Sequence, residues 1–128
     1  MDELGNLQLG AVLLVEDDFL IRLDLADLLR CSGFHQVVEA TTGDQALALL
    51  KACSDVAVVI TDINMPGTLD GLQLAAWIKA NRPELKVVIL SAYVPTINDG
   101  AVQADLLVAK PIRHGAFVAS VIRLLSDP

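Results

Sequence analysis

The sequence is poor in several residue types, and each shortage excludes a class of protein. Aromatic residues make up only 4% of the 128 residues, so a buried core must be built from Leu, Val, Ile and Ala. The 9 Lys and Arg residues are outnumbered by 16 Asp and Glu, which gives a net charge of −7. Phosphate backbones would repel such a chain, so we expect no direct binding to DNA or RNA.

Cysteine and long apolar runs are also scarce, and both shortages indicate where in the cell the protein is located. The two cysteines, Cys31 and Cys53, form no CxxC pair and supply no disulfide framework, so we interpret them as reduced thiols. No apolar run approaches the roughly 20 residues that span a bilayer. The acidic start, Met1–Leu4, differs from a secretory signal, which would be basic and then apolar. These features predict a cytoplasmic protein that does not associate with a membrane.

Hydrophobic residues, by contrast, make up 54% of the chain, which is enough to bury the core of one domain. Short apolar runs typical of buried strands alternate with amphipathic stretches typical of helices. The expected strands are 11–15, 36–39, 56–60, 86–90 and 106–109. The expected helices are 18–31, 42–53, 70–81, 95–103 and 113–126, of which the fourth should be short or irregular. The alternation predicts an α/β fold with an open, doubly wound, five-stranded parallel sheet and right-handed crossovers.

The helix starts carry recognisable capping residues. Thr42 and Gln45 have the spacing of a capping box, and Asp70 and Gln73 repeat it. Asp18 precedes the first helix, and we interpret it as an N-cap rather than as a metal ligand. We expect residues 1–128 to form a single domain, with residues 1–9 as a flexible N-terminal extension.

Polar side chains follow the expected strands at the point where each strand ends. They are Glu16 and Asp17 after the first strand, Asp62 after the third, Ser91 after the fourth and Lys110 after the fifth. In open parallel sheets, ligands bind beyond the carboxyl ends of the strands, so these residues should converge at one edge. Two unit charges about 4 Å apart repel by roughly 4 kcal/mol at an effective dielectric near 20, so clustered carboxylates favour a bound cation.

The donor set of this cluster indicates both the cation and the chemistry. Oxygen ligands without His or Cys favour a hard cation such as Mg²⁺. Asp62 would be a nucleophile, because carboxylates form aspartyl phosphates. Lys110 would pair with an oxygen of the incoming phosphoryl group, and Ser91 could donate a hydrogen bond to another.

With these residues in place, the chain resembles the receiver domains of two-component response regulators. The matching pieces are Val15-Glu16-Asp17-Asp18, Ile60 to Gly67 (ITDINMPG), Asp70-Gly71-Leu72, Leu90-Ser91-Ala92 and Lys110-Pro111. They occur in the family's order along the whole chain. The resemblance implies a flavodoxin-like (CheY-like) sheet with strand order 2-1-3-4-5.

The resemblance also implies a role for each matching residue. Asp62 corresponds to the phosphoacceptor, and Ser91 and Lys110 to the hydroxyl and lysine that contact the phosphoryl group. For Mg²⁺, Asp17 and Asp62 correspond to direct ligands, the backbone carbonyl of Asn64 to a third, and Glu16 to an acid that acts through water. The Lys110–Pro111 bond is expected to be cis. Asn64 and Tyr93 occupy the positions that tune the lifetime of the phosphoryl group.

The implied function is a phosphorelay. A histidine kinase or histidine phosphotransfer protein would donate the phosphoryl group to Asp62, and a conformational change would relay the signal to an unknown downstream protein. Two departures affect the output face. Leu107 stands where the family usually has an aromatic switch residue, and the interval from Ser91 to Lys110 is shorter than usual. We therefore predict intact phosphorylation chemistry with an atypical output face.

Three other functions compete with this interpretation. A phosphatase of the haloacid dehalogenase type needs a second acid two residues after its nucleophile, and that position is Asn64. A flavodoxin that binds FMN needs a phosphate-binding loop after the first strand, where this chain has acids instead. The remaining alternative is a protein-interaction module with a receiver fold that acts without phosphorylation.

Overall fold

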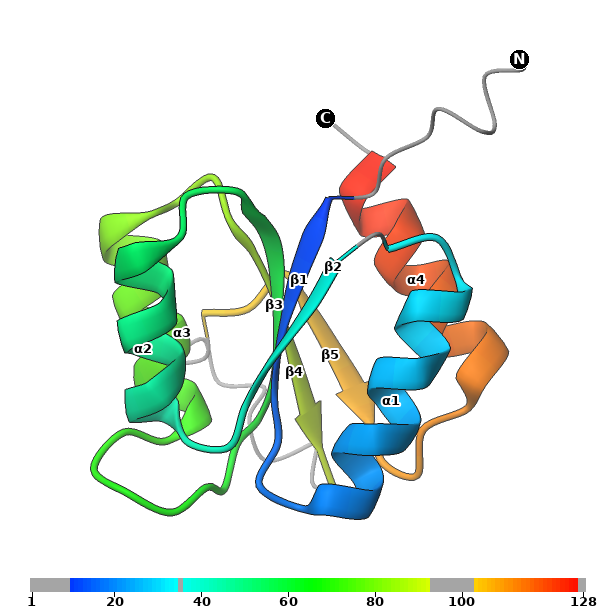
Figure 1. Ribbon diagram of the computed structural model, residues 1–128, viewed down its shortest axis with the longest axis horizontal. Helices are drawn as coiled ribbons and strands as arrows, with labels where there is room; N and C mark the ends of the chain where they lie inside the picture. Colours follow the sequence, from blue (N-terminus) through cyan, green and yellow to red (C-terminus); the bar gives the residue numbers. More distant parts are fainter. Residues whose placement is uncertain (1–9, 35, 93–102, 127–128) are drawn as a thin grey trace.

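The computed structural model describes residues 10–34, 36–92 and 103–126, which form an α/β domain (Figure 1). Its strands are β1 (Ala11–Val15), β2 (Gln36–Ala40), β3 (Val56–Asp62), β4 (Lys86–Ser91) and β5 (Leu106–Ala109). Its helices are α1 (Phe19–Cys31), α2 (Gly43–Ala52), α3 (Gly71–Asn81) and α4 (His114–Ser126). The helix expected at 95–103 and the extension expected at 1–9 lie outside the described residues, apart from Gln103, which belongs to no helix. The described part thus holds four of the five expected helices.

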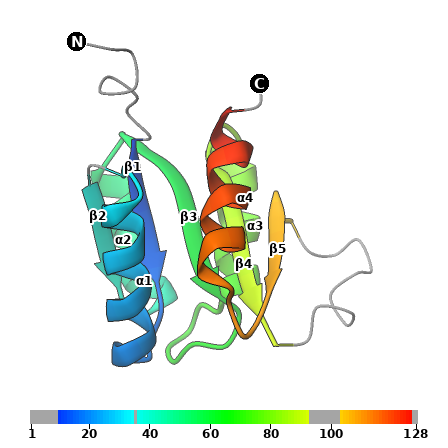
Figure 2. The ribbon, with the colours of Figure 1, turned by 90° about the vertical axis from the view of Figure 1, so that its right-hand side faces the viewer.

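The five strands form one parallel sheet in the order β2-β1-β3-β4-β5, as the resemblance implied. Helices α2 and α3 cover one face and α1 and α4 cover the other, as Figures 1 and 2 show. The strand that follows β1 in the chain, β2, lies on one side of β1, and β3 lies on the other side. The direction in which the chain adds strands therefore reverses between β1 and β3, which is where doubly wound sheets bind their ligands.

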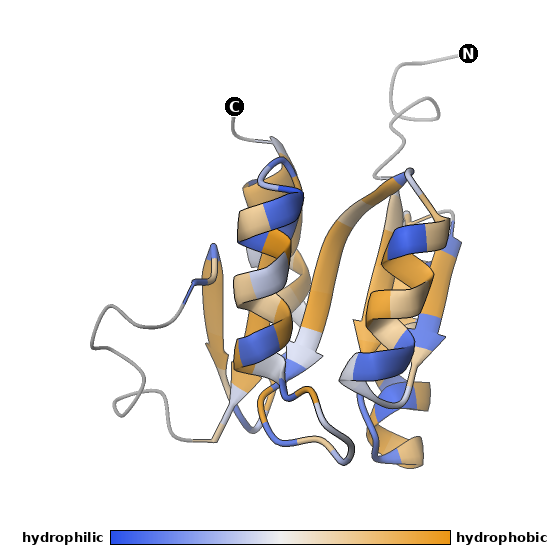
Figure 3. Ribbon diagram, turned by 90° about the vertical axis from the view of Figure 1, so that its left-hand side faces the viewer, coloured by the Kyte–Doolittle hydropathy of each residue, from blue (hydrophilic) through white to orange (hydrophobic). Residues whose placement is uncertain are grey.

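The hydrophobic core lies in two layers, one on each face of the sheet. Every residue of β1 is buried, and alternate side chains enter opposite layers. Leu13 and Val15 join the layer under α2 and α3, whereas Val12 and Leu14 join the layer under α1 and α4. In Figure 3 the strands are mostly hydrophobic, while hydrophilic residues lie on the helices. This explains why the strands read as continuous apolar runs in the sequence.

The helix caps follow the sequence prediction with one difference. Asp18 caps α1 by accepting a hydrogen bond of 3.0 Å from the Ile21 N–H. A complete capping box of Asp70 and Gln73 begins α3. Thr42 caps α2, but the Gln45 side chain accepts from the Thr41 N–H instead of closing the box on Thr42. That side chain also accepts from the Thr41 hydroxyl, a second bond that the Thr42 backbone could not offer.

The ends of β3 and β4 lie beyond the predicted apolar runs, because polar residues continue the ladder. Thr61 pairs with Ile89, and Asp62 pairs with Leu90, so β3 reaches Asp62. Ser91 pairs with Ala109 and ends β4. The strands therefore hold Asp62 and Ser91 directly. Among the described residues, no helix has both the length and the apolar character needed to cross a bilayer.

Candidate functional site

The site forms at the carboxyl ends of the strands, which point downward in Figure 1. Glu16 and Asp17 directly follow β1, Asp62 ends β3 and Lys110 follows β5. Because all five strands are parallel, these positions share one edge. The convergence expected from the sequence is therefore present in the fold.

Three carboxyl groups gather at this edge. Glu16, Asp17 and Asp62 each offer an oxygen, and these oxygens all lie within 4.8 Å of one another. Glu16 is only 1% exposed, and burial raises its pKa above the ordinary value. A hydrogen bond of 3.1 Å from the Asp18 N–H to Glu16 Oε2 opposes this rise, while the negative charge of Asp62 adds to it. Glu16 Oε1 is buried and accepts no hydrogen bond from the described residues.

Lys110 supplies the positive charge of the site. Its ammonium Nζ lies 2.9 Å from Asp62 Oδ2 and 3.8 Å from Glu16 Oε1. Burial of the ammonium opposes its charge, but the hydrogen bond to Asp62 and the nearby carboxylates outweigh that cost and raise the pKa of Lys110. Lys110 is therefore protonated and held against Asp62. The Lys110–Pro111 peptide bond is cis, as the resemblance implied.

Asp62 is fixed by its own backbone surroundings. Its Oδ1 accepts from the Ile63 N–H at 2.8 Å, which leaves Oδ2 directed at Lys110. The Asp62 carbonyl accepts from the buried Thr61 hydroxyl at 2.9 Å. The start of α3 closes on the same segment, where the Gly71 N–H donates to the Ile63 carbonyl at 2.8 Å. Asp62 thus presents its carboxylate from a rigid strand end.

Ser91 ends the strand next to the one that Asp62 ends, and Asn64 follows Asp62 by two residues. Ser91 is 5% exposed at the end of β4, and its carbonyl accepts from the Lys110 N–H at 2.9 Å. This bond ties the Lys110 backbone to the end of β4. Asn64 is exposed in the loop that follows β3, two residues after Asp62. Tyr93, the other position expected to tune the phosphoryl group, lies outside the described residues.

Sequence comparison places this arrangement in a known family. The profile of the response regulator receiver domain matches residues 12–122. The chain belongs to the response regulator receiver family.

Individual relatives agree with this assignment. The response regulator protein FleR of Pseudomonas aeruginosa is 40% identical over 118 residues, which cover 88% of this chain and 24% of FleR. The DNA-binding transcriptional regulator NtrC of Escherichia coli is 36% identical over 128 residues, covering 94% of this chain and 26% of NtrC. The chain therefore spans about a quarter of the length of these relatives.

Solved structures show the same fold. The response regulator TrrA of Thermotoga maritima, solved in complex with Mg²⁺-BeF, is 30% identical with a TM-score of 0.81, covering 89% of this chain and 97% of TrrA. The receiver domain of the sensor histidine kinase PA1611 of Pseudomonas aeruginosa superposes with a TM-score of 0.81 at 22% identity, covering 92% of this chain and 98% of that one. The second likeness concerns the fold alone.

The receiver's atypical residue, Leu107, lies in β5 and packs partly buried against the core layer under α2 and α3. The aliphatic side chain of Leu107 therefore contributes to the hydrophobic core on this face of the sheet. The rest of the interval between Ser91 and Lys110 lies largely outside the described residues. The atypical output face therefore remains a prediction.

An apolar groove of 570 Å³ adjoins the receiver site between α1 and the segment after β5. Lys110 lines both the groove and the site, and Leu20, which is 72% exposed, lines its α1 side. His114 forms an exposed pair with Asp24 at 2.9 Å, and both residues line the groove. The pair links the start of α4 to α1.

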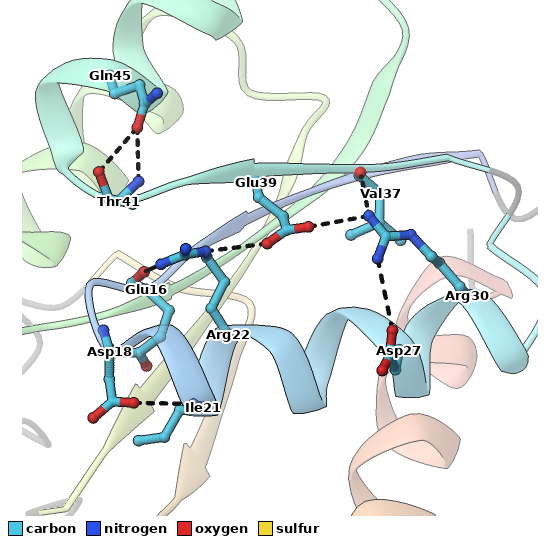
Figure 4. Close-up of polar contacts among 10 residues, drawn as sticks. All are labelled: Glu16, Asp18, Ile21, Arg22, Asp27, Arg30, Val37, Glu39, Thr41 and Gln45. Carbon is cyan, nitrogen blue, oxygen red and sulfur yellow. Dashed lines mark hydrogen bonds and ion pairs between the residues drawn. The ribbon is translucent and has the colours of Figure 1, made fainter.

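Arg22 carries only a weak sequence signal of a role at this site, yet its guanidinium Nη1 donates to the backbone carbonyl of Glu16 at 2.9 Å (Figure 4). Its Nε donates to Glu39, the last residue but one of β2. The signal is weak in the sequence because an arginine one turn into a helix is common on solvated faces. Glu39, near the end of β2, can be recognised as the partner of Arg22 only when β2 is known to lie beside β1.

Proposed function

We propose that this receiver accepts a phosphoryl group on the Asp62 carboxylate from a phosphohistidine and then signals to another protein. The observation that carries the proposal is the contact of Lys110 with Asp62 at 2.9 Å, beside two further carboxyl groups. A lysine held this way can compensate the charge of a phosphoryl group on the acceptor. Cytoplasmic location and the single-domain extent of residues 1–128 stay predictions of the sequence.

The donor atoms of the site fit Mg²⁺. The cluster offers carboxylate oxygens only, and hard divalent cations prefer such ligands. The buried Glu16 Oε1 supports the same assignment, because it accepts no hydrogen bond from the described residues and a buried polar atom without one is costly. Asp17, Asp62 and the Asn64 carbonyl would hold the ion, and Glu16 would act through water. When bound, Mg²⁺ neutralises charge on the phosphoryl oxygens and on the acids.

The residues of the chain then have distinct tasks. A carboxylate oxygen of Asp62 attacks the phosphorus, the P–N bond to the donor imidazole breaks, and its electron pair stays on the imidazole nitrogen. The Lys110 ammonium holds one phosphoryl oxygen, and the Ser91 hydroxyl donates to another. The short bond from Ile63 N–H to Asp62 Oδ1 orients the carboxylate before the donor arrives.

The donor in this proposal is a histidine kinase or a histidine phosphotransfer protein. Family membership supports this class of donor. Lys110 contacts Asp62 and also lines the apolar groove, so this groove lies next to the atom that a donor histidine would reach. The downstream partner would respond to the phosphorylated state.

Incubation with acetyl phosphate and Mg²⁺, followed by intact-mass measurement, tests the proposal. The wild type should gain one phosphoryl group, which Asp62→Asn should not gain. Asp55→Asn is the matched control, because Asp55 is exposed and precedes the opposite end of the same strand. It should gain the group like the wild type.

Two results would contradict the proposal. A wild type that gains no phosphoryl group would indicate an interaction module that acts without phosphorylation. Continuous release of phosphate from an aryl phosphate, abolished in Asp62→Asn, would indicate a phosphatase with turnover. If the assay succeeds, phosphotransfer rates from a panel of purified histidine kinases identify the natural donor as the fastest one.

A further inference from the structure

The side chain of Arg22 connects its own helix, α1, to β2 and to the loop that follows β1, next to the acidic cluster. Its Nη1 donates to the Glu16 carbonyl at 2.9 Å, and its Nε donates to Glu39 Oε1 at 3.1 Å. Figure 4 shows the guanidinium between α1, the start of the β1–α1 loop and β2. Only 14% of the Arg22 side chain is exposed, so these bonds are shielded from water.

The Glu16 carbonyl matters because of the peptide plane to which it belongs. This carbonyl and the Asp17 nitrogen are parts of one planar unit, so a bond to the carbonyl fixes the direction in which the chain enters Asp17. The Glu16 N–H is also bonded, to the Ala40 carbonyl at 3.0 Å. Both backbone groups of Glu16 are thus held before the loop reaches Asp17, whose carboxylate belongs to the cluster.

The guanidinium is in turn held in place by Glu39. Glu39 Oε2 accepts from Arg30 at 3.1 Å, and Arg30 lies 3.9 Å from Asp27. Acidic and basic side chains of α1 and β2 therefore form an alternating network, and Arg22 connects this network to the Glu16 carbonyl (Figure 4). The planar fork of arginine suits this task, because one side of it can bond a carboxylate while another bonds the carbonyl.

We propose that Arg22, held by Glu39, is a positioning residue that orients the Glu16–Asp17 peptide for divalent cation binding. The inference rests on the proposed function, because it concerns the same acidic cluster. Preorganised ligands bind more tightly, since the ordering of the loop is completed on folding. Groups behind a first ligand typically change metal affinity in this way.

Arg22 affects cation binding in two opposite ways. Its hydrogen bonds position the Glu16–Asp17 peptide and favour binding, whereas its positive charge opposes binding. A positive guanidinium repels a divalent ion, so removing the charge alone would tighten binding. Arg22→Lys keeps the charge and loses the fork, and it therefore isolates positioning. Glu39→Gln keeps the size of the partner and loses its charge.

The experiment is a Mg²⁺ titration of the full chain, followed by the Asp17 and Asp18 amide signals in NMR. Arg22→Lys should raise the Mg²⁺ dissociation constant about tenfold, as loss of an outer group does. Glu39→Gln should raise it less, and should add nothing in the Arg22→Lys background, since both act through one contact. Arg123→Gln is the control, with a change below about twofold, because Arg123 is exposed in the last turn of α4 and lies outside the network of Arg22, Glu39 and Arg30.

A second measurement uses metal-free protein. In Arg22→Lys the order parameter of the Asp17 amide should fall below that of the wild type, while the thermal unfolding midpoint stays close to the wild-type value. An unchanged dissociation constant in Arg22→Lys, or tighter binding, would overturn the positioning role. A wild type whose Asp17 amide ignores Mg²⁺ would instead overturn the proposed cation site, and the metal-free order parameter would still test the Arg22 contact.

Discussion

At the scale of single residues, Gly71 decides where Asp62 lies. A Cβ on Gly71 would lie 2.0 Å from the Asp62 carbonyl oxygen and 2.9 Å from the Ile63 Cα. These are backbone atoms, so α3 and the end of β3 would have to separate. The hydrogen bond from the Gly71 N–H to the Ile63 carbonyl depends on the same close approach.

Gly71→Ala should therefore destabilise the fold by about 3 kcal/mol, the upper part of the range for overpacking. It should also slow phosphorylation by acetyl phosphate, because Asp62 is displaced. Urea unfolding and intact mass measure the two effects. Gly115→Ala is the control, since nothing lies within 4 Å of a Cβ there, and it should be neutral or gain up to about 1 kcal/mol from helix propensity. Equal stability of the two variants would contradict the steric argument.

At the scale of elements, Arg82 connects the end of α3 to the end of α2. Its Nη1 donates to the carbonyls of Leu50 and Cys53 at 2.8 and 2.9 Å, and its Nη2 donates to the Ser54 carbonyl at 3.2 Å. Carbonyls at the end of a helix lack intrahelical partners, so the guanidinium serves as a cap supplied by another helix. The two helices are thereby joined at the edge opposite the site.

Arg82→Ala should lower the free energy of unfolding by roughly 2–3 kcal/mol, as expected for hydrogen bonds to a charged group. Arg82→Lys should recover part of this, because one ammonium cannot bond three carbonyls at once. Glu84→Ala is the control. Glu84 pairs with Arg82 at 3.5 Å but is 68% exposed, so its loss should cost less than about 0.5 kcal/mol. A comparable loss in Glu84→Ala, measured by urea unfolding, would mean that the ion pair rather than the cap stabilises this edge.

The elements themselves were largely predictable from the sequence. Hydrophobic periodicity located the described helices and strands because each buries a defined face against the sheet or a helix layer. The ends of β3 and β4 were placed too early, since Thr61, Asp62 and Ser91 are polar yet continue the ladder. Only pairing with a neighbouring strand shows that such residues belong to a strand.

At the scale of the whole molecule, the three carboxyl groups of the acidic cluster repel one another, and a bound cation would offset this repulsion. Three carboxyl groups share one edge in a chain of net charge −7. Without a cation, the repulsion among them opposes folding. With a bound cation, binding to the native state alone adds stability by mass action.

Mg²⁺ should therefore raise the thermal unfolding midpoint, by an amount equal to about 1.4 kcal/mol at ten times its dissociation constant. Asp17→Asn should abolish this gain. In EDTA the same variant should be slightly more stable than the wild type, by less than about 1 kcal/mol, because Asp17 is exposed. Calorimetry in both conditions checks the reversal of order. A variant less stable than the wild type in EDTA would show that Asp17 has a structural role instead.

The sequence by itself determined the alternation of elements, the capping residues Asp18 and Asp70, and the convergence of Asp17, Asp62 and Lys110 at one edge. These follow from local patterns and from the rule that parallel strands end together. Only the tertiary structure decided that Arg22 reaches the Glu16 carbonyl and that Gly71 lies against Asp62. Such contacts join segments distant in the chain, and they depend on strand neighbours and packing distances of a few ångströms, which no local pattern encodes.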